Sequence, residues 1–252
     1  MIHNRKVTAL CIVHYGCEYL STAIKAVYPI ADEIVIVYTG KPSHGGSTEE
    51  ACPESITDVI NESKRYDPDN KVLFIEGGVY GTEGEQRGKA EEICKQRGTE
   101  IIIRFDADEV WDTESLNESL KIVAGSDAKY FGVNGFVHFW KSFNNALYDG
   151  FTPVRFINVN SESNREVVIS GKIYHFSCAQ SDKIMRYKYL IHGHKNEIRP
   201  DWLESVYFNW KEGDTSLHPT SFQIWGSAVP FDKNTLPDIL KEHSNFNKET
   251  IN

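Results

Sequence analysis

The first half of the sequence alternates continuous apolar runs with amphipathic segments, and this alternation restricts the possible folds more than any other feature. The apolar runs read VTALCIVHY, EIVIVYTG, KVLFIEGG and TEIIIRFDADE, at residues 7–15, 33–40, 71–78 and 99–109. Continuous runs of this length are typical of strands buried on both faces of a parallel sheet. The helical patterns between them, such as 18–31 and 83–98, supply the crossover connections. We therefore predict an α/β fold with a mainly parallel sheet and helices on both faces.

The second half has a different pattern, with mixed strands and polar turns. A helix is predicted over 113–124, after which strands are expected at 130–140, 153–159 and 167–177, and a helix at 181–197. A further helix, before the third strand of the first half, is expected to begin at Ser47 or Thr48. We interpret the chain as one domain with a nucleotide-type half, 1–112, and a mixed α+β half, 113–252, that holds a second substrate.

Charge and composition exclude several classes of protein. The formal net charge of −9 argues against strong general binding to nucleic acids, although a local patch stays possible. No apolar run approaches the roughly 20 residues that span a bilayer, and the first residues lack a signal-peptide core, so we expect a cytoplasmic protein without a membrane span. The five cysteines are scattered and include no CxxC pair, which argues against a disulfide framework or zinc knuckle. Cys11 and Cys94 are expected in the core.

The last apolar run leads directly into acidic residues, in the stretch IIIRFDADEVWD. Packing such carboxylates together is costly unless a positive partner lies among them. In a strand, residues i and i+2 face the same side, so Asp106 and Asp108 are expected to face one site. Mg²⁺ and Mn²⁺ prefer oxygen ligands and are commonly completed by substrate phosphates, so the pair predicts a divalent cation. The alternative is that the acids cap the next helix, and for Asp112 we prefer it.

These residues also resemble a known family. The stretches ADEIVIVYTG and EGEQRGKAEEICKQRGTEIIIRFDADE are similar to glycosyltransferase family 2, whose GT-A fold has a strand that ends in a DxD-type motif. The resemblance covers residues 7–112 well and extends more loosely to about 210. It implies a metal-dependent transferase, inverting as is the rule in the family, that uses a nucleotide-sugar donor. A UDP-sugar is the expected donor, with Mn²⁺ or Mg²⁺ as cofactor and an acceptor that the sequence does not identify.

The resemblance assigns roles to the acid motif and to one arginine. Asp106 and Ala107 are expected near the nucleotide, with Asp106 also close to the metal. Asp108 is expected to coordinate the cation that bridges the diphosphate. Arg87, in GEQRGKA, is expected near the base or the phosphates.

The ends of the first two strands carry the remaining nucleotide-binding candidates, Tyr15, Tyr38 and Gly40. The family commonly has Asp where this chain has Tyr38, so the usual carboxylate contact with the base is absent and Tyr38 is expected to stack instead. The inserted loop after Gly40 is atypical of the family. Its His44 is interpreted as a surface residue.

Two more roles fall in the second half. GT-A enzymes often recruit a later histidine to the metal, and His175 in GKIYHFS is our first choice, with a core histidine as the alternative. His192 and His194 are expected in acceptor-side or structural roles. An inverting transferase also needs a general base, for which Asp149 and then Glu197 are the candidates, and either could be an ordinary turn residue.

Two other functions stay open at this point. A different metal-dependent nucleotide enzyme, such as a nucleotidyltransferase, could use the same acids, but HYGCEYL lacks the glycine-rich phosphate loop that such an enzyme normally carries. A catalytically silent module that binds a nucleotide or a carbohydrate is the other alternative, and Tyr38 is the feature that favours it.

Overall fold

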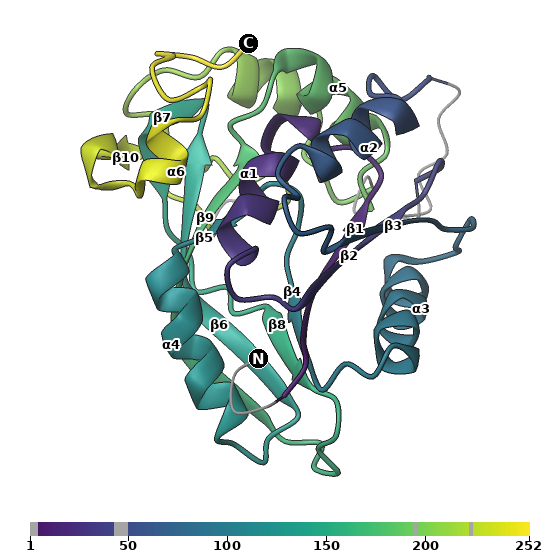
Figure 1. Ribbon diagram of the computed structural model, residues 1–252. Helices are drawn as coiled ribbons and strands as arrows, with labels where there is room; N and C mark the ends of the chain where they lie inside the picture. Colours follow the sequence, from purple (N-terminus) through teal and green to yellow (C-terminus); the bar gives the residue numbers. More distant parts are fainter. Residues whose placement is uncertain (1–4, 43–49, 194–195, 222–223) are drawn as a thin grey trace. The chain divides into compact units, whose positions relative to one another are not determined.

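The computed structural model describes residues 5–42, 50–193, 196–221 and 224–252 (Figure 1). The chain forms two compact units. The first comprises Met1–Ser43, Glu54–Phe136 and Gly150–Tyr174, and the second comprises His44–Pro53, Val137–Asp149 and His175–Asn252. The predicted halves, 1–112 and 113–252, were a division by role, and that division stays a prediction.

The first unit is built on a mixed sheet whose N-terminal strands are parallel. The parallel strands are β1 (Val7–Val13), β2 (Glu33–Tyr38), β3 (Val72–Glu76) and β4 (Ile101–Arg104), in the order β3-β2-β1-β4. Next to β4 lies β8 (Val154–Asn158), which is antiparallel to it, and then β6 (Tyr130–Trp140), antiparallel to β8. A separate pairing joins β5 (Glu109–Trp111) to β9 (Glu166–Cys178). The predicted α/β fold with parallel N-terminal strands is confirmed.

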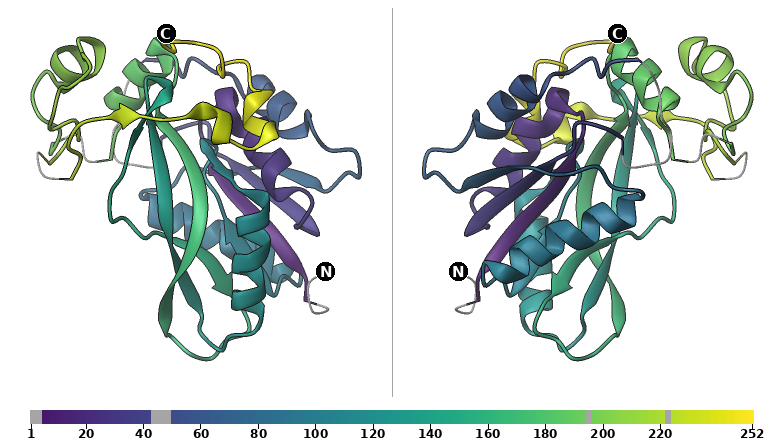
Figure 2. Two further views of the ribbon diagram at one scale, coloured as in Figure 1. Left: turned by 90° about the vertical axis from the view of Figure 1, so that its left-hand side faces the viewer. Right: turned by 90° about the vertical axis from the view of Figure 1, so that its right-hand side faces the viewer.

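Helices cover the parallel strands on both faces. They are α1 (Cys17–Val27), α2 (Ile56–Lys64) and α3 (Glu83–Gln96), whereas α4 (Thr113–Ala124) packs beside α1 and the antiparallel strand β8. Figures 1 and 2 show α3 on one side of the parallel strands and α1 on the other. On the α3 side, Ala90 and Cys94 pack against Leu10, Val35 and Ile102 in a fully apolar layer. Such small residues let the helix approach the sheet closely, and Cys94 is the core residue that the sequence predicted.

Side chains at the helix starts explain where the helices begin. Asp112 accepts a hydrogen bond from the backbone N–H of Ser115 at 2.9 Å, so the capping role preferred for it is confirmed. Ser55 caps α2 in a reciprocal pair with Asp58. The predicted start at Ser47 or Thr48 lies outside the described residues, and α2 itself begins only at Ile56.

The second unit is a smaller assembly around aromatic side chains. It contains β7 (Ser142–Leu147), β10 (Val229–Pro230), α5 (Asp182–Leu190), a π-helix at Leu203–Phe208, a 3-10 turn at Lys233–Thr235 and α6 (Asp238–Lys241). Its core includes the buried rings of Trp140, Trp202, Tyr207 and Trp225. Helix α5 ends at Leu190, earlier than the pattern over 181–197 predicted. No helix in the described part of the chain combines the length and apolar character that crossing a bilayer demands.

Candidate functional site

The carboxyl ends of the parallel strands bring the predicted nucleotide-binding residues to one edge of the first unit. Strands β4, β1 and β2 are neighbours and run in the same direction, with Val13 in register with Tyr38. The segments after them therefore begin at the same edge. These segments hold Tyr15, Gly40 and the acid loop, which we define as residues 105–109.

The acid loop is a turn rather than the end of a strand. Strand β4 stops at Arg104, and the Glu109 N–H donates to the Asp106 carbonyl at 3.0 Å. The i, i+2 spacing of a strand therefore does not set the directions of Asp106 and Asp108. Asp108 is half-buried, whereas Glu109 begins β5 and is only 1% exposed.

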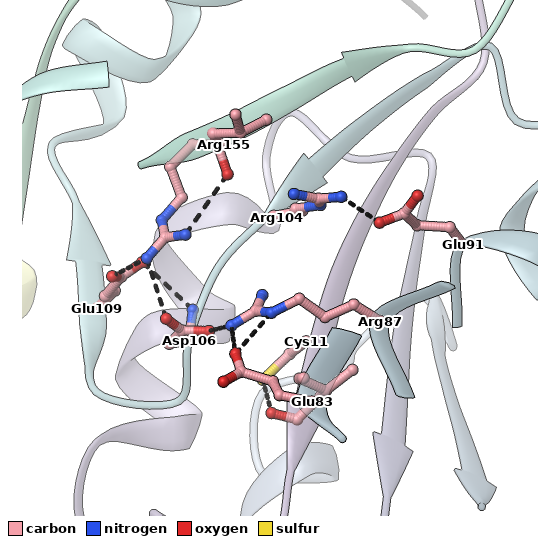
Figure 3. Close-up of polar contacts among 10 residues, drawn as sticks. Cys11, Glu83, Arg87, Glu91, Arg104, Asp106, Glu109 and Arg155 are labelled. Carbon is pink, nitrogen blue, oxygen red and sulfur yellow. Dashed lines mark hydrogen bonds and ion pairs between the residues drawn. The ribbon is translucent and has the colours of Figure 1, made fainter. Parts of the chain in front are cut away.

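Two arginines are the positive partners of Asp106. Figure 3 shows Arg87 from α3 and Arg155 from β8 both pointing to this carboxylate. Arg87 Nη2 lies 3.3 Å from Oδ1, and Arg155 Nη2 lies 3.0 Å from Oδ2. Glu83, one helical turn before Arg87, accepts a hydrogen bond from Arg87 Nε at 2.6 Å and so helps to orient the guanidinium group. The structure thus brings together Arg87 and Asp106, both predicted as nucleotide-binding.

Arg155 was missed by the sequence analysis. Its side chain is 7% exposed, forms an ion pair with buried Glu109, and lies over the ring of Phe136 at 5.6 Å. A buried arginine requires a carboxylate partner, because an unpaired charge in the interior is very costly. The lone arginine inside the apolar run PVRFINV was therefore a usable indication that a buried acid lies nearby.

The two guanidinium groups keep their charge. Burial alone disfavours charged Arg87, but the carboxylates of Asp106 and Glu83 outweigh it and raise its pKa above the ordinary value. Burial also lowers the pKa of Arg155, but the carboxylates of Glu109 and then Asp106 outweigh burial, so the pKa is raised above its ordinary value. Asp106 consequently faces permanent cations, which bear N–H groups aimed at anions.

The predicted cation at the acid loop would have few protein ligands. Within the described residues, no group of three or more His, Cys, Asp or Glu side chains is arranged to hold a metal. Both oxygens of Asp106 already accept hydrogen bonds from guanidinium groups. A cation held by one carboxylate and by substrate phosphates needs no larger protein cage. The assignment of Asp106 and Asp108 as metal ligands stays a prediction.

The loop between β1 and α1 packs directly on the acid loop. Gly16 has φ +133°, and a Cβ there would lie 2.7 Å from the Cβ of Ala107. Glu54, 7% exposed, accepts from the backbone N–H of Gly16 at 2.6 Å and of Cys17 at 3.1 Å. A protein carboxylate thus satisfies the first N–H groups of α1, where negative charge is favoured. No sequence pattern had pointed to Glu54.

Tyr38 is packed among aromatic neighbours of its own chain. It is 5% exposed, and its ring stacks on Phe74 and on His14, with centroid separations of 6.0 and 6.5 Å. Tyr15 is half-buried and meets the edge of His14. Stacking of a base on Tyr38 stays a prediction.

The second unit brings together two other predicted residues, Asp149 and His175. His138 connects them: its Nε2 lies 3.3 Å from Asp149 Oδ1, and its Nδ1 lies 2.9 Å from Nδ1 of His175. Trp225 Nε1 donates to the other Asp149 oxygen at 2.9 Å. Neither His138 nor Trp225 was a sequence candidate. The signal that could have indicated His138 is that it is the one polar residue in the strand-like, apolar stretch FVHFW.

The remaining candidates are placed apart from this group or are not described. Glu197 is exposed in a turn, and His192 stacks on Tyr189 with a centroid separation of 5.5 Å. His44 and His194 lie outside the described residues. The roles of Glu197 as a base and of His175 as a metal ligand stay predictions.

Comparisons with known proteins give only structural matches. No protein-family model and no curated protein matches the sequence. One similar solved structure is S. aureus TarS 1-349 in complex with UDP, with 12% identity, a TM-score of 0.42, and coverage of 74% of this chain and 64% of that one. Another is glucosyl-3-phosphoglycerate synthase from Mycobacterium tuberculosis with Mn²⁺, UDP-glucose and phosphoglyceric acid, with 10% identity, a TM-score of 0.36, and coverage of 55% and 45%.

A third similar structure is a cytidylyltransferase from Leptospira borgpetersenii, with 12% identity, a TM-score of 0.37, and coverage of 61% of this chain and 59% of that one. This chain therefore spans 45% to 64% of the length of the three structures. All three TM-scores are below 0.5, and the α/β fold of this chain follows from the strand pairing described above.

Proposed function

We propose that this protein is a nucleotide-sugar-dependent glycosyltransferase that moves a sugar, with inversion, to an acceptor of unknown class. The observation that carries the proposal is the position of the acid loop, at the carboxyl edge of the parallel strands, with two charged arginines on Asp106. In open α/β sheets this edge is where ligands bind. The sequence resemblance over residues 7–112 supplies the reaction class, with a UDP-sugar as the expected donor and the cytoplasm as the expected compartment.

Each residue of this edge has a part in the proposed reaction. Asp108 would hold Mn²⁺ or Mg²⁺ together with the donor diphosphate, and the bound cation supplies charge stabilisation for the leaving group. Arg87 offers a guanidinium to the phosphates or the base edge, and Asp106 keeps it in place. Tyr15, Tyr38 and Gly40 are proposed to border the nucleotide. The acceptor proton would go to a carboxylate base, of which exposed Glu197 is one candidate.

A second candidate function is a module that binds a nucleotide and transfers nothing. The observation that favours it is that both Asp106 oxygens already accept from guanidinium groups, so binding of a phosphate by Arg87 and Arg155 would not require a cation. Such a module would bind nucleotides equally well with and without Mn²⁺.

The test is a panel of nucleotide sugars incubated with the purified protein and Mn²⁺, with release of the free nucleotide as the readout and calorimetric binding of the nucleotide diphosphate in parallel. We expect release with one class of donor, and loss of metal-dependent binding in Asp108→Asn. Asp112→Asn is the matched control, because it removes a carboxylate from the same stretch while Asn still caps α4. Arg87→Ala should weaken donor binding by about 1–3 kcal/mol.

Three outcomes separate the hypotheses. Binding that does not depend on Mn²⁺, without release from any donor, would support the silent module. Release by Asp108→Asn at the parental rate would exclude Asp108 as the ligand. An unchanged dissociation constant in Arg87→Ala would place this arginine in a purely structural network.

A further inference from the structure

The second unit contains an ordered chain of hydrogen bonds that runs Trp225, Asp149, His138, His175. The three separations along it are 2.9 Å, 3.3 Å and 2.9 Å. All four residues belong to this unit, on β6, after β7, at the end of β9 and before β10. Three of the four members are enclosed: His138 is 4% exposed, Trp225 is 6% exposed, and the Asp149 side chain is 8% exposed. His175 is the half-buried end.

The donor and acceptor roles in this chain can be worked out from its fixed ends. An indole N–H can only donate and an ionised carboxylate can only accept, so Asp149 accepts from Trp225 and from His138 Nε2. A neutral imidazole carries one N–H, so His138 Nδ1 must be an acceptor. The nitrogen that faces it, His175 Nδ1, must then be the donor. Consequently the electron pair of His175 lies on Nε2.

The opposite order has a specific requirement. His175 Nδ1 could accept only if His138 carried protons on both nitrogens, that is, if His138 were an imidazolium. In the order in which His175 donates to His138, both histidines are neutral. Each N–H then donates and each acceptor atom accepts. The tautomer of a histidine is set by the hydrogen bond that its other nitrogen makes.

We propose that Asp149 and His138 are positioning residues that fix His175 in the Nδ1–H tautomer and so direct an electron pair from Nε2. In this proposal Asp149 orients His138 and takes no acceptor proton itself, and its two oxygens accept from His138 and Trp225. The role of the Nε2 electron pair rests on the cation of the proposed function and on the prediction from the sequence that His175 is one of its ligands. Histidines that bind metals are commonly oriented through their other nitrogen in this manner.

The tautomers can be measured without any substrate. Long-range ¹H–¹⁵N spectra of the metal-free protein at pH 8 report which ring nitrogen of each histidine is protonated. We expect Nε2–H for His138 and Nδ1–H for His175. Nε2–H on His175, or a doubly protonated His138, would overturn the proposal.

One substitution should reverse the whole chain. In Asp149→Asn the amide oxygen can accept only from Trp225, so the NH₂ group donates to His138 Nε2. His138 must then donate from Nδ1, and His175 must carry its proton on Nε2. Replacing an orienting aspartate by asparagine produces the wrong histidine tautomer in serine proteases, by the same rule. Unchanged tautomers in Asp149→Asn would contradict the proposed order.

Two controls keep the result interpretable. Trp225→Phe removes one donor to Asp149 but leaves the bond to His138, so both tautomers should stay as in the parent. Asp214→Asn changes an exposed carboxylate of the same unit and should alter neither. A reversal in Trp225→Phe would mean that Asp149 does not determine the order.

A manganese titration separates this inference from the proposed function. Mn²⁺ with a nucleotide diphosphate should broaden the His175 ring signals, and Asp149→Asn should lower manganese affinity about 10- to 100-fold, the usual effect of losing an orienting partner. If the tautomers are as expected but His175 is not broadened, the positioning inference holds and the metal role proposed for His175 fails.

Discussion

Asp106 in the first unit and Asp149 in the second are both shared between two nitrogen donors, yet the donors differ in kind. Asp106 accepts from two guanidinium groups, which hold a permanent positive charge. Asp149 accepts from an indole and an imidazole, neither of which holds a permanent charge, and its side chain is more enclosed, at 8% exposure against 31%. The first arrangement fixes charge, whereas the second fixes the position of protons.

The difference implies different sensitivities to substitution. Removing Arg155 takes away the cation that pairs with the buried carboxylate of Glu109, so the effect should appear in the free energy of unfolding. Changing Asp149 to its amide keeps two hydrogen bonds and mainly changes their direction, so the effect should appear in the histidine tautomers. The following predictions test this contrast.

The largest effect on stability is expected from Arg155→Leu. It removes the cation paired with Glu109, a carboxylate that is only 1% exposed, which should cost about 3–5 kcal/mol in the free energy of unfolding. Urea unfolding at pH 7 measures it. Arg165→Leu is the control, because the pair of Arg165 with Asp127 is exposed and its loss should cost less than about 1 kcal/mol. Similar losses in both variants would show that Arg155 is not a buried charge partner.

A smaller loss of stability is expected from Asp149→Asn. Its two hydrogen bonds become neutral ones, about half as strong as charge-assisted bonds, so we predict a cost of about 1–2 kcal/mol. Urea unfolding under the same conditions gives the comparison. A loss of stability as large as that of Arg155→Leu would contradict this difference between the two aspartates. It would mean that His138 is charged and forms an ion pair with Asp149.

The smallest effect concerns Glu33, near the surface, and it gives a baseline for ordinary ion pairs. Hydrogen bonding to Arg97, and then to Lys6, lowers the pKa of Glu33 below its ordinary value of 4.5. A lowered folded-state pKa means that this stabilisation is complete above the unfolded pKa and is lost as pH falls through the folded pKa. Glu33→Gln should therefore lose less stability than the parent between pH 6 and pH 3, by about 0.5–1 kcal/mol. Equal losses in the two proteins would remove Glu33 from this pH dependence.

The sequence predicted the parts of this molecule that depend on local pattern. The parallel strands followed from continuous apolar runs, and the cap at Asp112 from its place before a helix. The resemblance indicated both Arg87 and Asp106, which the structure joins across 19 positions.

The features that were missed depend on pairings that only the fold creates. Arg155 reaches Asp106 across 49 positions, and Glu54 reaches Gly16 across 38. A lone charge in an apolar run predicts that a partner exists but does not identify it. Likewise, His175 and Asp149 were each predicted separately from the sequence. Only the fold shows that His138 lies between them and contacts both.

The contact between Gly16 and Ala107 has a consequence for recognising related chains. Because only 2.7 Å would separate a Cβ at Gly16 from that of Ala107, position 16 cannot gain a side chain unless the backbone of one loop moves away. Position 16 is therefore restricted by the middle residue of the DAD stretch, which lies 91 positions later, since 107 minus 16 is 91. A chain with this same loop arrangement should carry small residues at both places together. A search for related chains that requires small residues at both positions is more selective than a search for the two aspartates alone.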